Sequence, residues 1–330
     1  MDYFPSFIGR TPKLVADLTD DSFWSLPVSE LDNPEIFRSI LETLPTGVYL
    51  MDRDRKILFW NRAAENVTGY LRQDVVGHFL REHLLAADKE VKGADLEPTD
   101  SLRVAFRDGK STTAHVSILH KEGYRVPIVL RTVPIRDERG AVMVAVECFE
   151  INVSSIERTR RLAEVAKLGC LDEMLGIPAR SFMEPHLREK LTAFEERHIH
   201  FGILLIQVEK MDHLRAARGP GVVPPIHRVV TQTIENSLRP TDLVGCWSEY
   251  QFMAVLMGCR ENSVNFVARR IMNRISQSEI KWWGDAFSVT AAFGGTGSRP
   301  GDTLELLLER AEISLTKSIA DAESSAILPG

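Results

Sequence analysis

A short run in the C-terminal half of the chain carries the residue types best suited to binding a polar ligand. Arg239 and Asp242 stand three residues apart in Arg-Pro-Thr-Asp, and five residues separate Asp242 from the polar run Ser248–Gln251. An arginine supplies a rigid fork of N–H donors, and an aspartate supplies acceptor oxygens. The Arg-x-x-Asp pattern alone is expected about once by chance in a chain of this composition, so its meaning depends on the elements that position it.

The surrounding pattern predicts a β-hairpin and a mixed α/β domain. Apolar residues before and after Gly245–Phe252 predict two short strands, with this run as the tip of the hairpin. Other segments have the periodicity of helices or of a buried strand. The predicted elements are helices at 181–196, 225–238, 262–276 and 302–319, and strands at 201–209 and 287–294. Asp302 and Glu305 are predicted to cap the last helix as a capping box.

Two motifs resemble the GGDEF, or diguanylate cyclase, family. The run Asp172-Glu-Met-Leu-Gly-Ile-Pro-Ala-Arg180 is similar to the family's opening motif D-x-L-T-G-L-P-N-R at Asp, Gly, Pro and Arg. The hairpin is similar to the family's signature turn, Gly-Gly-Asp/Glu-Glu-Phe, of which Phe252 remains. The resemblance covers about residues 171–325 and implies the β-α-α-β-β-α-β-α order of nucleotidyl cyclases and polymerase palms. It also implies a reaction that joins two GTP molecules with divalent metal held by carboxylates.

The family's catalytic positions carry other residues in this chain. Its metal ligands fall on Gln207 and Tyr250, which are both uncharged near pH 7. Ser248 and Glu249 replace the glycine pair that lets the backbone approach the nucleotide, and Gln251 replaces the last acid of the turn. The resemblance therefore implies a degenerate active site with no catalytic and no metal-binding residues.

Three further positions of the family's active site also carry other residues in this chain. One alternative arrangement of carboxylates would still hold a metal ion. The guanine-contacting Asn falls on Arg215, the downstream Asp falls on or beside Pro224, and the lysine of the last helix falls near Ile319. Glu209 stands two residues after Gln207 on the same strand face. With Glu249 it would rebuild a carboxylate pair, which leaves weak diguanylate cyclase activity as an alternative.

The Arg-x-x-Asp motif occupies the place of the family's inhibitory site for cyclic di-GMP. The resemblance implies that Arg239, Asp242 and an arginine of the following helix, Arg270 or its neighbour Arg269, bind this ligand. The alternative is a surface ion pair between Arg239 and Asp242 at a helix–strand junction, left over from an enzymatic ancestor.

The N-terminal half resembles a PAS domain. Thr46-Gly-Val-Tyr-Leu-Met-Asp52, Ile57–Tyr70 and Val75-Val-Gly77 match PAS motifs, and three long strands are predicted at 114–120, 125–134 and 142–149. A helix is predicted at 34–44. The resemblance covers about residues 33–151 and implies an antiparallel sheet with flanking helices that serves as a sensor or dimerisation module. Its ligand stays unknown. This half of the chain contains four histidines that could ligate haem, but a surface or hydrogen-bonding role is favoured for them. They are His78, His83, His115 and His120.

Residues 152–170 predict a helical linker with a weak coiled-coil seam. A helix that packs on its own chain explains the same pattern equally well. Residues 1–32 form an N-terminal extension, either a loose tail or a strap. The net charge of −6 and the lack of basic runs speak against nucleic acid as a partner. No apolar run is long enough to cross a membrane, and four scattered cysteines fit a reducing cytosol.

The sequence thus predicts an α+β protein with four parts: 1–32 extension, 33–151 PAS sensor, 152–170 linker and 171–330 degenerate GGDEF domain. We expect a cytoplasmic, bacterial signalling protein that dimerises through the PAS domain and linker helix and acts on an unknown protein partner. The expected function is binding of cyclic di-GMP without catalysis. The alternatives are an interaction scaffold that binds no nucleotide and a weakly active cyclase.

Overall fold

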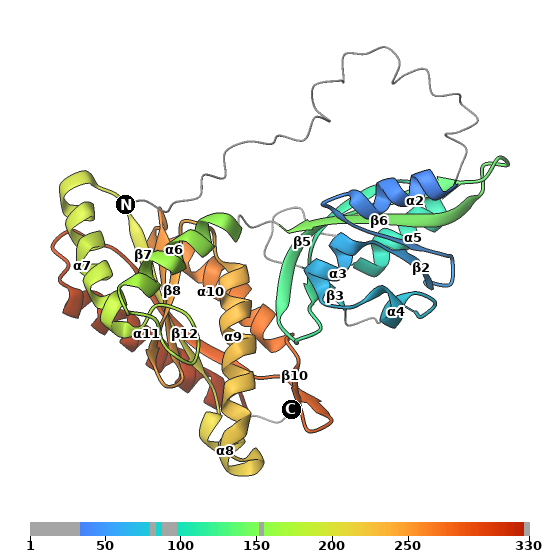
Figure 1. Cartoon of the computed structure of the whole chain (residues 1–330). Coiled ribbons are helices and arrows are strands. Elements are labelled where there is room, and N and C mark those ends of the chain that lie inside the picture. The colour runs from blue at the N-terminus through green and yellow to red at the C-terminus, as the bar shows by residue number, and fades with distance from the viewer. Residues whose placement is uncertain (1–33, 80–83, 88–97, 152–154, 327–330) are drawn as a thin grey trace, which may run out of the picture. The chain divides into compact units, whose positions relative to one another are not determined.

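The computed structural model describes residues 34–79, 84–87, 98–151 and 155–326 (Figure 1). The predicted extension 1–32 and His83 lie outside these residues. The chain divides into two compact units, Met1–Pro45 and Thr46–Gly330. The first unit contributes one described helix, α2 (Pro34–Thr43), close to its predicted bounds. Although α2 is amphipathic, none of its residues is buried within the chain.

The N-terminal domain contains a six-stranded antiparallel sheet in the order β2-β1-β6-β5-β4-β3. The strands are β1 (Gly47–Met51), β2 (Ile57–Trp60), β3 (Leu85–Ala87), β4 (Thr112–Leu119), β5 (Arg125–Arg136) and β6 (Val142–Ile151). The three long predicted strands correspond to β4, β5 and β6. Helix α3 (Arg62–Thr68) packs on β1, and α5 (Pro98–Asp108) packs on β4, β5 and β6. A short helix, α4 (Arg72–Val75), follows α3.

One buried asparagine joins the first strand of this sheet to α3. Asn61 Oδ1 accepts hydrogen bonds from the backbone N–H of Val48 and of Ala64, both at 2.9 Å. It therefore caps α3 and ties that helix to β1. The helix ends at Gly69, whose φ of 73° is the left-handed conformation that glycine adopts without strain. These residues belong to the predicted PAS motif.

Helix α6 (Ser155–Lys167) lies within the predicted linker. Its Val165 is only 2% exposed in the single chain. This burial supports the alternative in which the helix packs on its own chain.

The C-terminal domain has a four-stranded antiparallel sheet in the order β12-β7-β9-β8. Its strands are β7 (Phe201–Val208), β8 (Leu243–Ser248), β9 (Gln251–Met257) and β12 (Ala291–Gly297). Its helices are α7 (Arg180–Arg197), α8 (Met211–Arg218), α9 (Val223–Ser237), α10 (Glu261–Ser276) and α11 (Leu304–Ala326), and a 3-10 turn precedes α9. A small hairpin, β10 (Ile280–Trp282) and β11 (Asp285–Phe287), follows α10. Apart from α7 and this hairpin, the order is the predicted β-α-α-β-β-α-β-α.

Helices cover both faces of this sheet. One core lies under α9 and α10, around Ile226, Ile234, Phe252 and Ile271. The other lies under α7 and α11, around Leu187, Phe201, Met253 and Leu307. The hairpin strand β9 contributes to both cores because its successive side chains point to opposite faces. The two ends of β9 are therefore held rigidly.

The last strand begins later than predicted. The sequence predicts it at 287–294, whereas β12 spans Ala291–Gly297. The start differs because Phe287 belongs to β11, which pairs with β10. The end differs because Gly294 stays within the strand, where a Cβ would collide with the backbone of Ala311 and Leu315 in α11. The glycine-rich run indicates a strand end by composition, but here it lets a helix pack directly on the strand.

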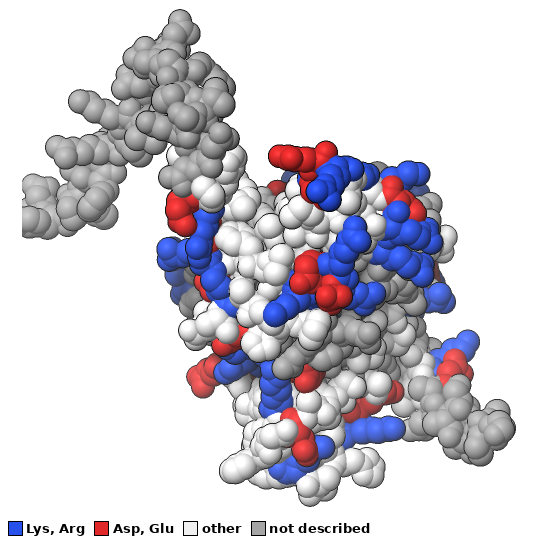
Figure 2. All heavy atoms as spheres, turned by 90° about the vertical axis from the view of Figure 1, so that its right-hand side faces the viewer, with Lys and Arg blue, Asp and Glu red and all other residues white. Residues whose placement is uncertain are grey.

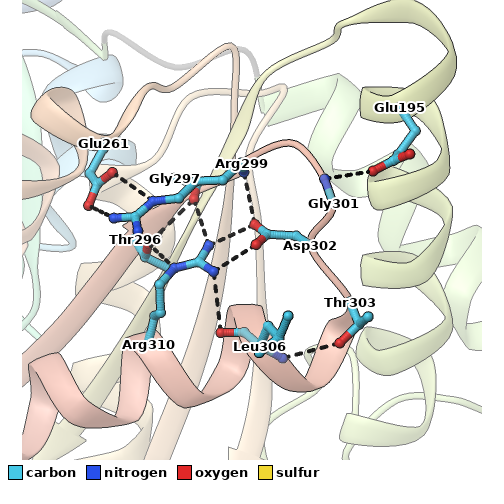
Figure 3. Close-up of polar contacts among 10 residues, drawn as sticks. All are labelled: Glu195, Glu261, Thr296, Gly297, Arg299, Gly301, Asp302, Thr303, Leu306 and Arg310. Carbon is cyan, nitrogen blue, oxygen red and sulfur yellow. Dashed lines mark hydrogen bonds and ion pairs between the residues drawn. The ribbon is translucent and has the colours of Figure 1, made fainter.

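The predicted capping box of the last helix is wrong. Helix α11 begins at Leu304, and its first turn is capped by Thr303, whose Oγ1 accepts from the backbone N–H of Leu306 at 3.3 Å. Asp302 instead forms a two-pronged ion pair with Arg310, with both N–O distances 2.7 Å (Figure 3). Asp302 also accepts from the backbone N–H of Arg299 at 2.8 Å. Asp302 therefore stabilises the loop between β12 and α11 and does not cap the helix.

Charged groups of both signs share the face shown in Figure 2. Lysine and arginine side chains gather on one part of it, with aspartate and glutamate side chains among them. This mixture agrees with the modest net charge of −6.

Candidate functional site

The turn of the β8–β9 hairpin is tighter than the sequence suggests. Strand β8 ends at Ser248 and β9 begins at Gln251, opposite each other, so Glu249 and Tyr250 alone form the turn. The register shifts between Cys246 and Ser248, which marks a bulge just before the turn. The polar run is thus partly strand, and its side chains have fixed directions.

Two amides meet where the cyclase family places carboxylates. Gln207 on β7 lies opposite Gln251 on β9, and Gln251 Nε2 donates to Gln207 Oε1 at 2.7 Å. Ser248 Oγ makes a longer contact of 3.3 Å with Gln251 Oε1. An amide pair satisfies its own polar atoms and carries no net charge, so it offers a divalent cation little compensation for lost water. No group of three His, Cys, Asp or Glu in the described part of the chain is placed to hold a metal ion.

The positively charged side chain of Arg215 contacts the hairpin turn, at the position where the family has a neutral asparagine. Arg215 Nη1 donates to the Tyr250 hydroxyl at 3.1 Å and lies 3.5 Å from Glu249 Oε1. Interaction with the Glu249 carboxylate is the main cause that raises the pKa of Tyr250, so the phenol stays neutral. Glu249 faces Arg215, and Glu209 lies one residue beyond the end of β7. The carboxylate pair considered as a rescue stays a prediction.

A buried histidine behind the turn was missed by the sequence prediction. His227 on α9 is 3% exposed, and its ring packs against Tyr250 and Phe252 with centroids 5.9 and 6.2 Å away. Burial is the largest cause that lowers its pKa, which favours a neutral imidazole. His227 stands on the apolar stripe Val223-His227-Val230-Ile234, and that periodicity was the available signal. The ring helps fill the space below the turn.

The Arg-x-x-Asp loop is fixed by its own aspartate. Asp242 Oδ2 accepts from the backbone N–H of Arg239, and Oδ1 accepts from that of Met257, both at 3.0 Å. The loop is thereby tied to the end of β9. Burial raises the pKa of the Asp242 carboxyl, although these two hydrogen bonds and the charges of Arg239 and Arg270 oppose the rise. Among the described contacts, the Arg239 side chain forms no ion pair with Asp242, in contrast to the surface ion pair considered above.

The structure brings the three predicted ligand-binding residues together. Arg270 on α10 donates from Nη2 to the backbone carbonyl of Ser237 at 2.8 Å, next to the loop. Burial is the main cause that raises the pKa of the Cys259 thiol, and the charges of Asp242, Arg239 and Arg270 act on it to a smaller extent, so all three lie near this thiol. The Arg239 side chain is exposed. The neighbouring Arg269 is exposed as well, which leaves Arg270 as the arginine that faces the loop.

An arginine of the linker helix also reaches this loop. Arg161 on α6 donates from Nη1 to the backbone carbonyl of Asp242 at 3.0 Å, with a weaker contact of 3.5 Å to that of Thr241. Arg161, Leu162 and Pro240 line a shallow groove between α6 and the loop. The sequence prediction missed this contact, because nothing in a helical pattern indicates which distant carbonyls an arginine will meet.

The remaining predicted positions have local roles. Pro224 lies in the first turn of α9, where proline is tolerated, and Ile319 packs against the core below α11. In the N-terminal domain, His120 stacks on Tyr124 with centroids 4.3 Å apart and accepts a hydrogen bond from the backbone N–H of Glu122. This arrangement agrees with the hydrogen-bonding role favoured for the histidines.

Comparison with known families identifies both halves of the chain. The PAS fold family matches residues 35–149, and the family "Diguanylate cyclase, GGDEF domain" matches residues 170–323. The chain therefore contains a PAS domain followed by a GGDEF domain. The predicted order of a PAS and a GGDEF domain and the predicted α+β fold class are confirmed; the degeneracy of the GGDEF domain stays a prediction. No described helix is both long and apolar enough to cross a membrane.

Individual relatives are distant. The probable diguanylate cyclase DgcE of Escherichia coli (strain K12) is 21% identical over 266 residues, which cover 78% of this chain. The chain spans 22% of the length of that relative.

Solved structures of single domains and larger fragments also match. The diguanylate cyclase SiaD of Pseudomonas aeruginosa, solved in complex with its activator SiaC, is 21% identical with a TM-score of 0.45; the match covers 50% of this chain and 70% of that one. The GGDEF domain of DgcB from Caulobacter crescentus, solved in complex with c-di-GMP, is 15% identical with a TM-score of 0.45, covering 46% and 91%. A PAS domain from Colwellia psychrerythraea is 19% identical with a TM-score of 0.30, covering 36% and 94%.

Proposed function

We propose that the GGDEF domain is a non-catalytic receptor for cyclic di-GMP that binds at Arg239, Asp242 and Arg270. The observation that carries this proposal is the convergence of these residues at one end of β9, while the opposite end holds an uncharged amide pair. The chain keeps the residues of a ligand site and lacks those of a metal site.

Catalysis is opposed by charge. Phosphoryl transfer between two GTP molecules needs divalent metal, which hard carboxylate oxygens hold and neutralise. Gln207 and Gln251 satisfy each other, and Tyr250 is neutral. Glu249 adds a negative charge close to where the phosphates of a nucleotide would lie. Each of these features disfavours a metal–nucleotide complex.

The loop is suited to a guanine and a phosphate. The exposed Arg239 fork can donate to the acceptor atoms O6 and N7 of guanine or to phosphate oxygens. Each oxygen of the Asp242 carboxylate accepts one hydrogen bond from a backbone N–H group. A carboxylate can accept about four hydrogen bonds in all. Acceptor capacity therefore remains for the N–H groups of guanine. Arg270 is oriented in advance by the Ser237 carbonyl, which reduces the entropy lost on binding.

Calorimetric titration of the full chain with cyclic di-GMP tests the proposal. We expect saturable binding that needs no Mg²⁺, and no heat from GTP with Mg²⁺ under the same conditions. Incubation of the chain with GTP and Mg²⁺ or Mn²⁺, followed by mass spectrometry, should give no cyclic dinucleotide. The absence of cyclic di-GMP binding up to millimolar ligand would refute the receptor function.

A second candidate is an interaction scaffold that binds no nucleotide. Helix α2 favours it, because its apolar residues Phe37 and Ile40 are 54% and 50% exposed although the helix is amphipathic. Such a face is usually covered by a partner. If Arg239→Ala left cellular function and partner binding unchanged while Phe37→Asp abolished them, the scaffold would replace the receptor as the main function.

A further inference from the structure

The inner face of the PAS sheet carries a row of polar side chains across four adjacent strands. Thr112 on β4 lies directly opposite Thr132 on β5, and Thr132 lies opposite Glu147 on β6. Glu147 lies opposite Tyr49 on β1. Residues directly opposite each other in a sheet point to the same face with Cβ atoms about 5 Å apart. The four side chains therefore form one continuous line inside the domain.

This row is buried and only partly hydrogen-bonded. Glu147, Tyr49 and Thr132 are all 0% exposed, and Ser101 on the covering helix α5 is also 0% exposed. Thr132 Oγ1 donates to Glu147 Oε1 at 2.7 Å. The other buried oxygens have no hydrogen bond of ordinary geometry within the described part of the chain: Glu147 Oε2, Tyr49 Oη, Thr112 Oγ1 and Ser101 Oγ. Since more than about nine in ten buried polar groups are bonded, this concentration calls for a functional reason.

No described cation faces the Glu147 carboxyl. The groups that approach it are Tyr49 from β1, Thr132 from β5 and the buried side of α5, which presents Ser101, Leu102 and Ala105. Tyr49 is the only titratable group among them. The described charged residues of α5 are exposed, and the neighbours Cys148 and Glu150 on β6 point to the opposite face. A carboxylate without a cation is strongly disfavoured in such surroundings.

We propose that this row is a proton-sensing site of the PAS domain, in which Glu147 gains and loses a proton. In the protonated state the Glu147 carboxyl is neutral and its O–H can donate to the Tyr49 oxygen. On deprotonation the proton leaves to solvent, and the Tyr49 O–H turns to donate to the carboxylate. Tyr49 and Thr132 are the positioning residues that hold either state.

The directions of both pKa shifts agree with this geometry. Burial raises the pKa of Glu147 to about 7, against the opposing effects of the nearby Tyr49 hydroxyl and of the hydrogen bond from Thr132. Burial, followed by the negative charge of Glu147, raises the pKa of Tyr49 well above its ordinary value. The phenol therefore keeps its proton throughout the range in which Glu147 titrates.

The position of Glu147 gives the site a path to the rest of the chain. Strand β6 lies between β1 and β5 and ends at Ile151, and α6 begins at Ser155. Arg161 of α6 then bonds the carbonyl of Asp242 in the proposed ligand loop. A change in β6 is thereby connected through the backbone to the output domain. The proton site itself does not depend on the receptor function proposed above.

The test is the pH dependence of unfolding of the full chain, compared between wild type, Glu147→Gln and Glu150→Gln. Because the folded pKa of Glu147 is raised, its proton stabilises the fold fully below the unfolded pKa, and this stability is lost as pH rises through the folded value. We expect the midpoint of the PAS unfolding transition to fall by about 5–10 °C between pH 5 and pH 8 in wild type. Glu147→Gln should flatten this dependence, and the exposed Glu150→Gln should keep it.

Hydrogen exchange of β5 and β6 peptides, corrected for the intrinsic pH effect, reports the same transition locally. Tyr49→Phe provides a second variant, because removal of the phenol that favours the carboxylate should move the transition to higher pH. If the row had a purely structural role, the substitutions Glu147→Gln and Tyr49→Phe would lower the stability equally at every pH. An unchanged pH dependence in Glu147→Gln, or in Tyr49→Phe if the glutamine variant does not fold, would overturn the proposal.

Discussion

The two ends of strand β9 treat charge in opposite ways. At its start, Gln251 pairs with Gln207 through neutral amides, and Tyr250 stays protonated. At its end, the backbone N–H of Met257 donates a hydrogen bond to the Asp242 carboxylate, which lies near the charges of Arg239 and Arg270. Both ends are held by the same rigid strand, packed in two cores. The difference therefore comes from the side chains alone, since the two ends lie about 20 Å apart along one strand.

The largest expected effect is loss of ligand binding at the charged end. Arg239→Ala and Arg270→Ala should each weaken cyclic di-GMP binding by about 10–100-fold, because each removes a charge-assisted contact of about 1.5–3 kcal/mol. Arg215→Ala removes an arginine at the uncharged end and should leave the dissociation constant unchanged. Titration calorimetry on the three variants measures this contrast.

Arg269→Ala is the matched control for Arg270, since the two arginines are adjacent but only Arg270 reaches the Ser237 carbonyl. Equal losses in Arg269→Ala and Arg270→Ala would show general electrostatic attraction rather than a defined site. A loss in Arg215→Ala as large as in Arg239→Ala would move the ligand to the hairpin turn.

The next effect concerns stability. Asp242→Ala should lower the free energy of unfolding by about 2 kcal/mol, since it leaves the backbone N–H groups of Arg239 and Met257 without their acceptor. Gln251→Ala removes the neutral hydrogen bond to Gln207 and the longer one from Ser248, both at a partly exposed site, and should cost about 1 kcal/mol. Urea denaturation of the full chain, followed by circular dichroism, compares the two. A greater loss for Gln251→Ala would reverse the view that the Asp242 loop is the better-anchored end.

Much of this fold follows from the sequence, because the helices have one apolar face, the central strands are nearly continuous apolar runs, and turn residues stand at their ends. Asn61, Gly69 and the inner face of α9 follow such local rules. The predictions that failed depend on distant partners. Asp302 precedes a helix and matches a capping pattern, but Arg310, two turns into α11, competes for its carboxylate. Local propensity cannot rank a cap against an ion pair that only tertiary packing supplies.

The candidate site divides in the same way. Tyr250 and Gln251 could be assigned from the local register of the hairpin, and Gln207 from its place at the end of the predicted strand 201–209. The contact between Gln207 and Gln251 joins residues on different strands, and the reach of Arg161 to the Asp242 carbonyl joins two segments 81 residues apart. Glu147 is hardest of all, because only the pairing of four strands shows that its neighbours are Tyr49, Thr132 and Thr112.

The smallest expected effect is produced by putting charge back at the start of β9. In the double variant Gln207→Asp, Gln251→Glu, two carboxylates replace amides whose atoms lie 2.7 Å apart. Like charges at that distance repel, so we expect the free energy of unfolding to fall by about 1 kcal/mol without divalent metal. Mg²⁺ should restore the loss, because a ligand that binds the folded state alone stabilises it by mass action.

Thermal unfolding with and without Mg²⁺ measures this effect, and wild type serves as the control that should not respond. Gln207→Asn, Gln251→Asn changes side-chain length without adding charge and separates repulsion from altered packing. If wild type gained as much stability from Mg²⁺ as the double-carboxylate variant, the amide pair would itself be a metal site. The contrast between the two ends of β9 would then rest on ligand geometry and no longer on charge.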